Sequence, residues 1–330
     1  MKKLINHPNR LVEDMLEGYV AAYSDYIRYE PGSRVVLRCL PKKQGVGLVI
    51  GNGSGHEPIA MGWVGQGMLD ANAVGDIFTA PPPELILEAL RKANLGQGCL
   101  LLISNHAGDV LNGELAVEMA REEGLRVEPL LMYDDIASAP KGRESERRGA
   151  PGTTFIYKLV GARAEEGASL RELLELGSLV RDSTRSLSVA IRPGISPLTG
   201  EAMFTLAEDE IFIGMGVHGE AGFKRQKLAP AAEVVRTVTE AILDDLPFRF
   251  GDEVLVLVNG AGATTLGELL VVYRELDAVL KGRGVHPYKP LVGTYITTQE
   301  MAGVSVALCR TTPELNRLWD SPCRVPFFGR

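Results

Sequence analysis

His218 lies in the run Gly214-Met215-Gly216-Val217-His218-Gly219-Glu220-Ala221-Gly222, in which four of nine residues are glycine. Glycine has no Cβ and adopts backbone angles closed to other residues, so the run predicts a tight loop that a ligand can approach closely. A neutral imidazole has a lone pair that can attack a carbonyl carbon, and histidine is a known covalent nucleophile. The simpler alternative is an ordinary turn whose histidine points into solvent.

Two other polar segments each follow an apolar run typical of a buried strand. Gly53-Ser54-Gly55-His56 comes after Val46–Ile50, and Ser104-Asn105-His106-Ala107-Gly108-Asp109 comes after Cys99–Ile103. Ligands of α/β sheets bind beyond the carboxyl ends of strands, so we expect both segments to contact a ligand. The predicted binding residues are Gly53, Ser54, Gly55, His56, Ser104, His106, Asp109 and His218. Asp109 is also a candidate N-cap of the helix that follows.

The chain carries no recognisable nucleotide-binding motif. The glycine-rich segment after Ile50 lacks the Lys-Ser/Thr of a P-loop and the full spacing of a dinucleotide fingerprint. The signature set of protein kinases is absent as well. We therefore expect no nucleotide and no metal ion to be bound by this chain itself.

Composition excludes several classes of function. The chain has 35 basic and 42 acidic residues and a net charge of −7, which argues against a general nucleic-acid or anionic-membrane surface. No apolar stretch approaches the roughly 18 residues that a membrane span needs, and polar residues soon follow Met1-Lys2-Lys3, so a cytoplasmic protein is expected. The scattered cysteines Cys39, Cys99, Cys309 and Cys323 are typical of reduced core thiols.

The pattern of elements predicts an α/β fold. A chain of 330 residues exceeds the usual size of one core, and apolar strands alternate with amphipathic segments of helical length. We expect two α/β domains, 1–185 and 186–330, each with a mixed sheet flanked by helices and with the substrate site at the domain interface. The predicted helices in the middle and second half are 154–166, 170–181, 231–245 and 266–280, with strands at 187–191 and 254–258.

Together, Gly53 to Pro58, Gly108-Asp109 and Gly214 to Gly222 resemble the substrate-binding subunit of dihydroxyacetone kinase, the DhaK family. The resemblance extends over essentially the whole chain. It includes Met1 to Asn6, Gly65 to Met68 and Gly262 to Leu269.

The resemblance implies an unusual chemistry. His218 would add covalently to the ketone of dihydroxyacetone and hold it as a hemiaminal, His56 would donate a hydrogen bond to the ketose, and Asp109 would act as general base on the hydroxyl that is phosphorylated. A covalent bond to a carbonyl would reject polyols such as glycerol.

The resemblance also implies partners. The chain would be a homodimer and half of an enzyme. A nucleotide (ATP or ADP) with Mg²⁺ would be carried by a separate subunit of the DhaL type, which a phosphotransferase protein of the DhaM type recharges in some members.

Three departures from the family pattern leave alternatives open. The family has Lys-Asn-Tyr-Thr-Gly-Asp where this chain has Ser104 to Asp109, an aromatic residue at the position of Gly113, and a proline at that of Ala221. Smaller side chains could admit a longer ketose such as erythrulose, with His106 contacting its extra hydroxyl. A non-catalytic coactivator paralogue would need His218 but not Asp109, and the intact Gly108-Asp109 favours the kinase subunit.

Overall fold

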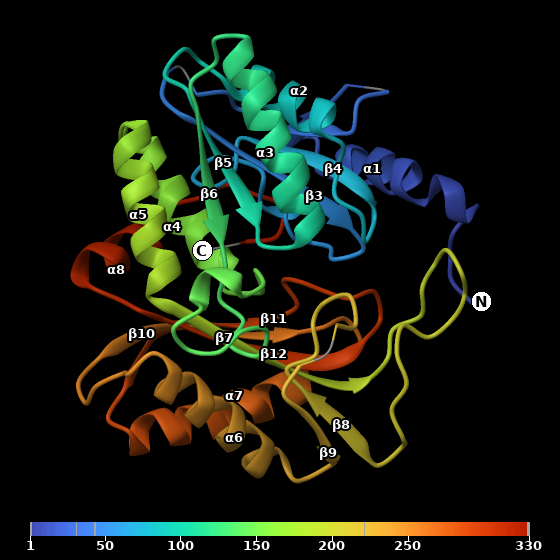
Figure 1. The fold of residues 1–330 in the computed structure, drawn as a ribbon, viewed down its shortest axis with the longest axis vertical. Helices are drawn as coiled ribbons and strands as arrows, with labels where there is room; N and C mark the ends of the chain where they lie inside the picture. The colour runs from blue at the N-terminus through green and yellow to red at the C-terminus, as the bar shows by residue number, and fades with distance from the viewer. Residues whose placement is uncertain (1, 31, 43, 221, 329–330) are drawn as a thin grey trace. The chain divides into compact units, whose positions relative to one another are not determined.

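The computed structural model describes residues 2–30, 32–42, 44–220 and 222–328, and these form two compact units (Figure 1). The first unit comprises Lys2–Met132, Ile156–Leu179 and Arg317–Arg330, and the second comprises Tyr133–Phe155 and Val180–Asn316. Each unit contains one six-stranded mixed sheet with helices packed against it. The predicted α/β fold with two mixed sheets is therefore confirmed.

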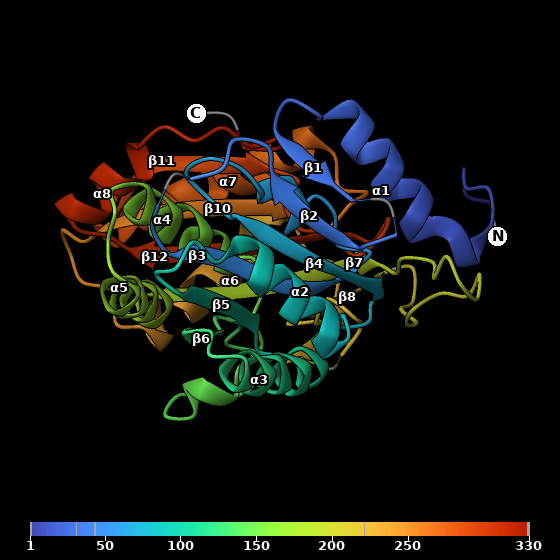
Figure 2. The same ribbon diagram turned by 90° about the horizontal axis from the view of Figure 1, so that it is seen from above.

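The sheet of the first unit has the strand order β1-β2-β4-β3-β5-β6, which can be followed in Figure 2. The strands are β1 Ile27–Tyr29, β2 Val35–Arg38, β3 Gly47–Ser54, β4 Ala71–Ile77, β5 Cys99–Ser104 and β6 Val127–Met132. β4, β3, β5 and β6 pair in parallel, whereas β2 is antiparallel to its neighbours. Since β3 and β5 are adjacent and parallel, their carboxyl ends lie at the same edge of the sheet.

Helices α2 Pro83–Ala93 and α3 Ala107–Glu122 pack side by side on this sheet (Figure 1). α2 contacts β3 and β4, and α3 contacts β5 and β6. Their apolar faces share a core with Val49 and Leu101 of the strands. The other helical segments that lie wholly or partly in this unit are the 3₁₀ helices Pro8–Arg10 and Met61–Trp63, α1 Leu11–Ala22, α4 Thr153–Glu165, α5 Leu170–Asp182 and α8 Pro313–Asp320.

The sheet of the second unit has the order β11-β10-β12-β7-β8-β9. The strands are β7 Thr184–Arg192, β8 Glu210–Ile213, β9 Lys224–Lys227, β10 Glu253–Gly260, β11 His286–Gly293 and β12 Ala302–Arg310. Only β10 and β11 pair in parallel, and the other neighbours are antiparallel. The edge strand β9 has the sequence Lys-Arg-Gln-Lys, and its three basic side chains discourage pairing with a further strand.

Helices α6 Ala231–Asp245 and α7 Leu266–Gly282 cover one face of the second sheet (Figure 1). A capping box starts α7, because the Thr265 side chain accepts from the backbone N–H of Glu268 while the Glu268 carboxylate accepts from that of Thr265. Val238 and Leu276 pack into the buried core with strand residues such as Val256. A further 3₁₀ helix, Glu144–Glu146, belongs to the segment that precedes α4.

The helices predicted at 154–166, 170–181, 231–245 and 266–280, and the strands at 187–191 and 254–258, are all confirmed with small shifts of their ends. The prediction of domains at 1–185 and 186–330 differs from the compact units in two main segments. Tyr133–Phe155 joins the second unit, because Ile136 donates to the backbone oxygen of Ser186 at the start of β7. The C-terminal segment after Asn316 joins the first unit, where Arg324 bridges to Gln66. The domain boundary near residue 185 stays a prediction.

One buried ion cluster ties the segment before α4 to the rest of the second unit. Asp245, at the end of α6, accepts from Arg147 at 2.7 and 2.6 Å and from Arg185 of β7 at 2.6 Å. Burial acts to raise the pKa of Asp245, but the two guanidinium groups outweigh it and hold that pKa below its usual value. The pairing therefore stabilises the fold above the unfolded-state pKa of about 3.9, and this contribution is lost as the pH falls through the lowered value.

We expect Asp245→Ala to lower the free energy of unfolding by about 3 to 5 kcal/mol, because it leaves two buried guanidinium groups without their shared carboxylate. Denaturant titration at neutral pH measures the change. The matched control is Asp244→Ala, since Asp244 is 70% exposed in its pair with Arg283 and should cost less than about 1 kcal/mol. Equal losses in the two variants would contradict this role for Asp245.

Candidate active site

His218 lies in the loop that joins β8 to β9 in the second unit. Gly214 and Gly219 adopt left-handed backbone angles, with φ of 86° and 88°, which explains two of the glycines. At Gly222 a Cβ atom would collide with the backbone of Gly214, so the two ends of the loop approach too closely for a side chain. The predicted tight, glycine-dependent loop is confirmed.

The backbone N–H and the ring nitrogen Nδ1 of His218 both face the carboxylate of Glu220. The backbone N–H of His218 donates to Glu220 Oε2 at 2.9 Å, and Nδ1 lies 3.0 Å from Oε1. An ionised carboxylate can only accept hydrogen bonds, so in the neutral imidazole this geometry assigns the proton to Nδ1 and the lone pair to Nε2. The side chain of His218 is 29% exposed, so the ring is ordered by its partner but still accessible.

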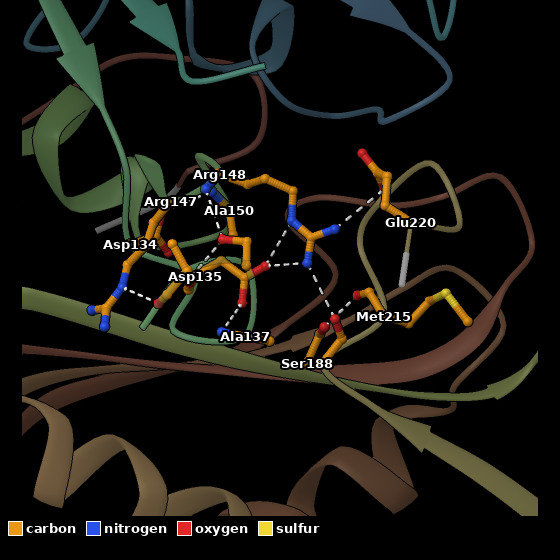
Figure 3. Close-up of polar contacts among 12 residues, drawn as sticks. Asp134, Asp135, Ala137, Arg147, Arg148, Ala150, Ser188, Met215 and Glu220 are labelled. Carbon is orange, nitrogen blue, oxygen red and sulfur yellow. Dashed lines mark hydrogen bonds and ion pairs between the residues drawn. The ribbon is translucent and has the colours of Figure 1, made fainter. Parts of the chain in front are cut away.

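Arg148, from the segment before α4, approaches the same carboxylate (Figure 3). Its Nη1 lies 3.8 Å from Glu220 Oε2. Asp135 Oδ2 accepts from Arg148 Nε at 3.0 Å and from Nη2 at 2.7 Å, and Nη2 also donates to the backbone oxygen of Gly214 at 3.2 Å. Burial raises the pKa of the Asp135 carboxyl, and the charge of Arg148 opposes that effect.

Two hydroxyl groups fix the backbone of the histidine loop. Ser188 of β7 donates to the backbone oxygen of Met215 at 2.5 Å, a contact visible in Figure 3. Thr298 donates to the backbone oxygen of Val217 at 2.9 Å. These bonds satisfy two carbonyl groups of the loop, so Met215 is held by the sheet and Val217, just before His218, by a neighbouring loop.

His56 lies in the first unit, just after the end of β3, and is 7% exposed. Its ring centroid is 5.0 Å from that of Phe78. Phe78 has a φ of 55°, which is uncommon for a bulky residue. Its backbone N–H donates to the backbone oxygen of Ser54 at 2.8 Å. Strain of this kind persists where the surrounding structure enforces it, and here it places an aromatic ring against His56.

β3 extends further than the sequence indicates, so Gly53 and Ser54 are the last residues of the strand and not part of the turn. The Ser54 hydroxyl donates to the backbone oxygen of Gly75 at 2.7 Å. A Cβ at Gly53 would come within 2.8 Å of the backbone nitrogen of Thr79. Close packing against the loop after β4 thus accounts for Gly53, and Gly55, with φ of 100°, forms the turn before His56.

The second polar segment of the first unit runs from the end of β5 into α3. Ser104 ends the strand, and its backbone oxygen accepts from the N–H of His106 at 2.7 Å. The suggestion that Asp109 is the N-cap is wrong: His106 occupies that position, and Asp109 lies in the first helical turn. A negative charge is favoured there by the exposed N–H groups of the helix end.

The loop between β4 and α2 lies beside both polar segments of the first unit. The backbone of Thr79 packs closely against Gly53. A Cβ at Gly108 would lie 3.4 Å from Ala80, and the Asn112 side chain donates to the backbone oxygen of Pro81 at 2.9 Å. Seven of the eight predicted binding residues are thus gathered around one edge of the first sheet, and His218 belongs to the second unit.

The departures from the family pattern fall in different environments. Gly113 is buried in α3, and a Cβ there would come within 2.7 Å of Ile103 Cδ1, so the missing side chain leaves no empty space. His106 is partly exposed at the helix N-terminus. Ala221 lies outside the described residues. The erythrulose alternative therefore depends on the departures within Ser104 to Asp109, His106 among them, and stays a prediction.

Two of the four cysteines, Cys99 and Cys309, are buried and do not compete with His218 as nucleophiles. All four thiols are free. Burial raises the pKa of Cys99 and of Cys309 to about 12, so both stay protonated at neutral pH.

Among the described residues, no helix is long and apolar enough to cross a membrane.

Sequence reasoning did not assign roles to Glu220, Arg148 or Asp135. Glu220 follows His218 by two residues, so the spacing was a signal for a carboxylate beside the imidazole. Arg148 and Asp135 gave no signal, because they are far from the loop in the chain and only the fold brings them to it.

Comparison with known proteins supports the motif analysis. The Dak1 domain pattern matches residues 17–327. The chain is 43% identical to the dihydroxyacetone-binding subunit DhaK of PTS-dependent dihydroxyacetone kinase 1 from Listeria innocua, over 99% of this chain and 98% of that protein.

Two solved structures share the fold. The dihydroxyacetone kinase operon co-activator DhaQ is 30% identical with a TM-score of 0.90, over 94% of this chain and 96% of that one. The C. freundii dihydroxyacetone kinase in complex with AMP-PNP and Mg²⁺ is also 30% identical with a TM-score of 0.90. The matched part spans 98% of this chain and 60% of the C. freundii chain.

Glu220→Gln should abolish the uniform Nδ1–H tautomer of His218, since an amide can either donate or accept at Nδ1. Nitrogen NMR of isotope-labelled histidine above neutral pH reports the tautomer. His7 is an internal control with the opposite assignment, because its Nδ1 accepts from the backbone N–H of Asn9 at 3.2 Å. An unchanged His218 signal in the variant would contradict the role assigned to Glu220.

Proposed function

The chain belongs to the Dak1 domain family, and on that premise we propose that it is the ketose-binding subunit of a dihydroxyacetone kinase, with His218 as the covalent anchor. The single observation that carries the proposal is the contact of Glu220 with Nδ1 of His218 at 3.0 Å, because it leaves Nε2 as the nucleophilic nitrogen.

The covalent step balances without any co-reactant. The Nε2 lone pair forms a bond to the ketone carbon, the C=O π bond breaks, and the electron pair moves to oxygen. The imidazole becomes positive as the bond forms, and the Glu220 carboxylate at Nδ1 stabilises that charge. Loss of the Nδ1 proton and protonation of the new alkoxide complete a neutral hemiaminal, so the whole ketose is added and no water leaves.

Such an anchor selects the functional group of the substrate. Glycerol has the same carbon skeleton but no carbonyl carbon for Nε2 to attack. Hydrogen bonds alone would discriminate only in part between a ketose and a polyol. The covalent bond therefore explains why a kinase for a small ketose would use a histidine that is not itself an acid–base catalyst.

The first unit supplies the groups that orient and activate the ketose. We assign His56, held against Phe78, as a hydrogen-bond donor to the bound ketose. Asp109 is assigned as the general base that takes the proton from the hydroxyl to be phosphorylated. The Ser54 hydroxyl is already bonded to Gly75, so Gly53, Ser54 and Gly55 would contribute mainly through their backbone. Ser104 and His106 are assigned as further contacts.

The phosphoryl donor would be bound by a separate subunit. The C. freundii kinase was solved with AMP-PNP and Mg²⁺ and is longer than the part it shares with this chain, which supports a nucleotide site outside that part. A DhaL-type partner with ATP or ADP and Mg²⁺, recharging by a DhaM-type protein, a homodimer and a cytoplasmic location all belong to this proposal.

A coactivator role is the second candidate, because a co-activator shares the fold at a TM-score of 0.90. Both functions need the covalent anchor, but only the kinase subunit needs a general base. Asp109 in the first turn of α3 is the feature that favours the kinase subunit.

His218→Ala should abolish covalent ketose binding, because no other group is assigned to attack the ketone. Native mass spectrometry with dihydroxyacetone, each enantiomer of erythrulose and glycerol measures it. Wild type should gain the full ketose mass and gain nothing from glycerol. The control His7→Ala, at an exposed histidine, should behave as wild type. An equal adduct on His218→Ala would refute the anchor.

Asp109→Asn should leave adduct formation intact but lower turnover with a nucleotide-loaded partner subunit at least about a hundredfold, since an amide cannot accept the hydroxyl proton. Glu118→Gln, at an exposed carboxylate of the same helix, is the matched control and should not change turnover. If Asp109→Asn turned over at the wild-type rate, the general base would have to be another group.

A further inference from the structure

We propose that Arg148 is a positioning residue of the covalent step, acting through Glu220 and not on the ketose itself. The inference rests on the proposed function for its chemical meaning. It deepens that proposal, because it identifies what holds the carboxylate that in turn holds the nucleophilic imidazole.

Glu220 needs such support. Its side chain is 36% exposed, and a partly exposed glutamate has several accessible rotamers. Both of its oxygens must face His218 to take the backbone N–H and Nδ1 together. The Nη1 of Arg148, 3.8 Å from Oε2, attracts the carboxylate into this rotamer.

Arg148 is itself held in place by contacts that do not involve Glu220. Its side chain is 13% exposed, and its Nε and Nη2 groups donate to Asp135 Oδ2 at 3.0 and 2.7 Å. Asp135 is fixed in turn, since its Oδ1 accepts from the backbone N–H of Ala137 at 3.0 Å. Figure 3 shows the resulting chain of contacts. Exposed ion pairs contribute little to stability because both side chains lose conformational entropy when they pair. Here the contacts with Asp135 already restrict the arginine side chain.

The loop reserves space for this contact. A Cβ atom at Gly216 would collide with both Glu220 Oε2 and Arg148 Nη1. Gly216 does not have a positive φ, so its backbone conformation does not require glycine. The space taken by the two side chains therefore explains why glycine stands at this position.

The test is a double-mutant cycle on the ketose dissociation constant, with Arg148→Gln, Glu220→Gln and the double variant. We expect each single change to weaken ketose binding about tenfold, and Arg148→Gln to add less than about twofold when Glu220 is already changed. Gly216→Ala, which keeps every charged group but displaces the two side chains, should give a similar loss. Losses that multiply to about a hundredfold, or no loss in Arg148→Gln, would overturn the proposal.

The His218 tautomer provides a readout that a general loss of stability does not move. Arg148→Gln should disturb the uniform Nδ1–H signal as Glu220→Gln does. Arg38→Gln is the matched control: it removes an arginine that is also buried, pairs with Asp70 in the first unit and is given no role at Glu220, so it should lower stability while keeping the signal. A wild-type signal in folded Arg148→Gln would refute the positioning role.

The two proposals fail in different ways. If wild type formed no His218-dependent adduct, the proposed function would fail, while the tautomer signal would still report whether Arg148 positions Glu220. If wild type formed the adduct but the cycle were additive, the proposed function would stand and the role of Arg148 would be rejected.

Discussion

The chemistry proposed for His218 depends on one constraint: an imidazole attacks a carbonyl only if the attacking nitrogen carries no proton. Glu220 meets this constraint by accepting from the other ring nitrogen and from the backbone N–H of the same residue. A flexible loop could not hold that geometry alone. Ser188 on β7 and Thr298 fix its carbonyl groups, and Arg148 approaches the carboxylate from a separate segment.

The fold explains where this support comes from. Tyr133–Phe155 runs from the end of β6 into the first residues of α4 but pairs with the start of β7, so Asp135 and Arg148 belong to the second unit. The buried cluster of Asp245 with Arg147 and Arg185 holds the same segment. Residues outside the histidine loop thus support the position of the proposed nucleophile, a common property of sites whose functional groups are oriented by their neighbours.

Much of the secondary structure and the loop around His218 was predictable from local sequence, because periodicity and glycine content report on local structure. The four helices predicted at 154–166, 170–181, 231–245 and 266–280, the strands before the two polar segments, and the loop around His218 follow from residue types alone. The role of Gly53 was not predictable in this way, since its close approach to Thr79 depends on how the loop after β4 folds back. Likewise Arg148 is 66 residues from Gly214, and no local pattern links them.

The central claim is that Nε2 of His218 forms a covalent bond to the ketone carbon. The most direct test is NMR of the wild-type protein with isotope-labelled histidine and dihydroxyacetone labelled at its ketone carbon. The account predicts that the bound carbon loses its ketone signal, becomes tetrahedral and shows one-bond coupling to Nε2 of His218. A bound ketose that keeps its ketone signal, or one coupled to Nδ1, would contradict it.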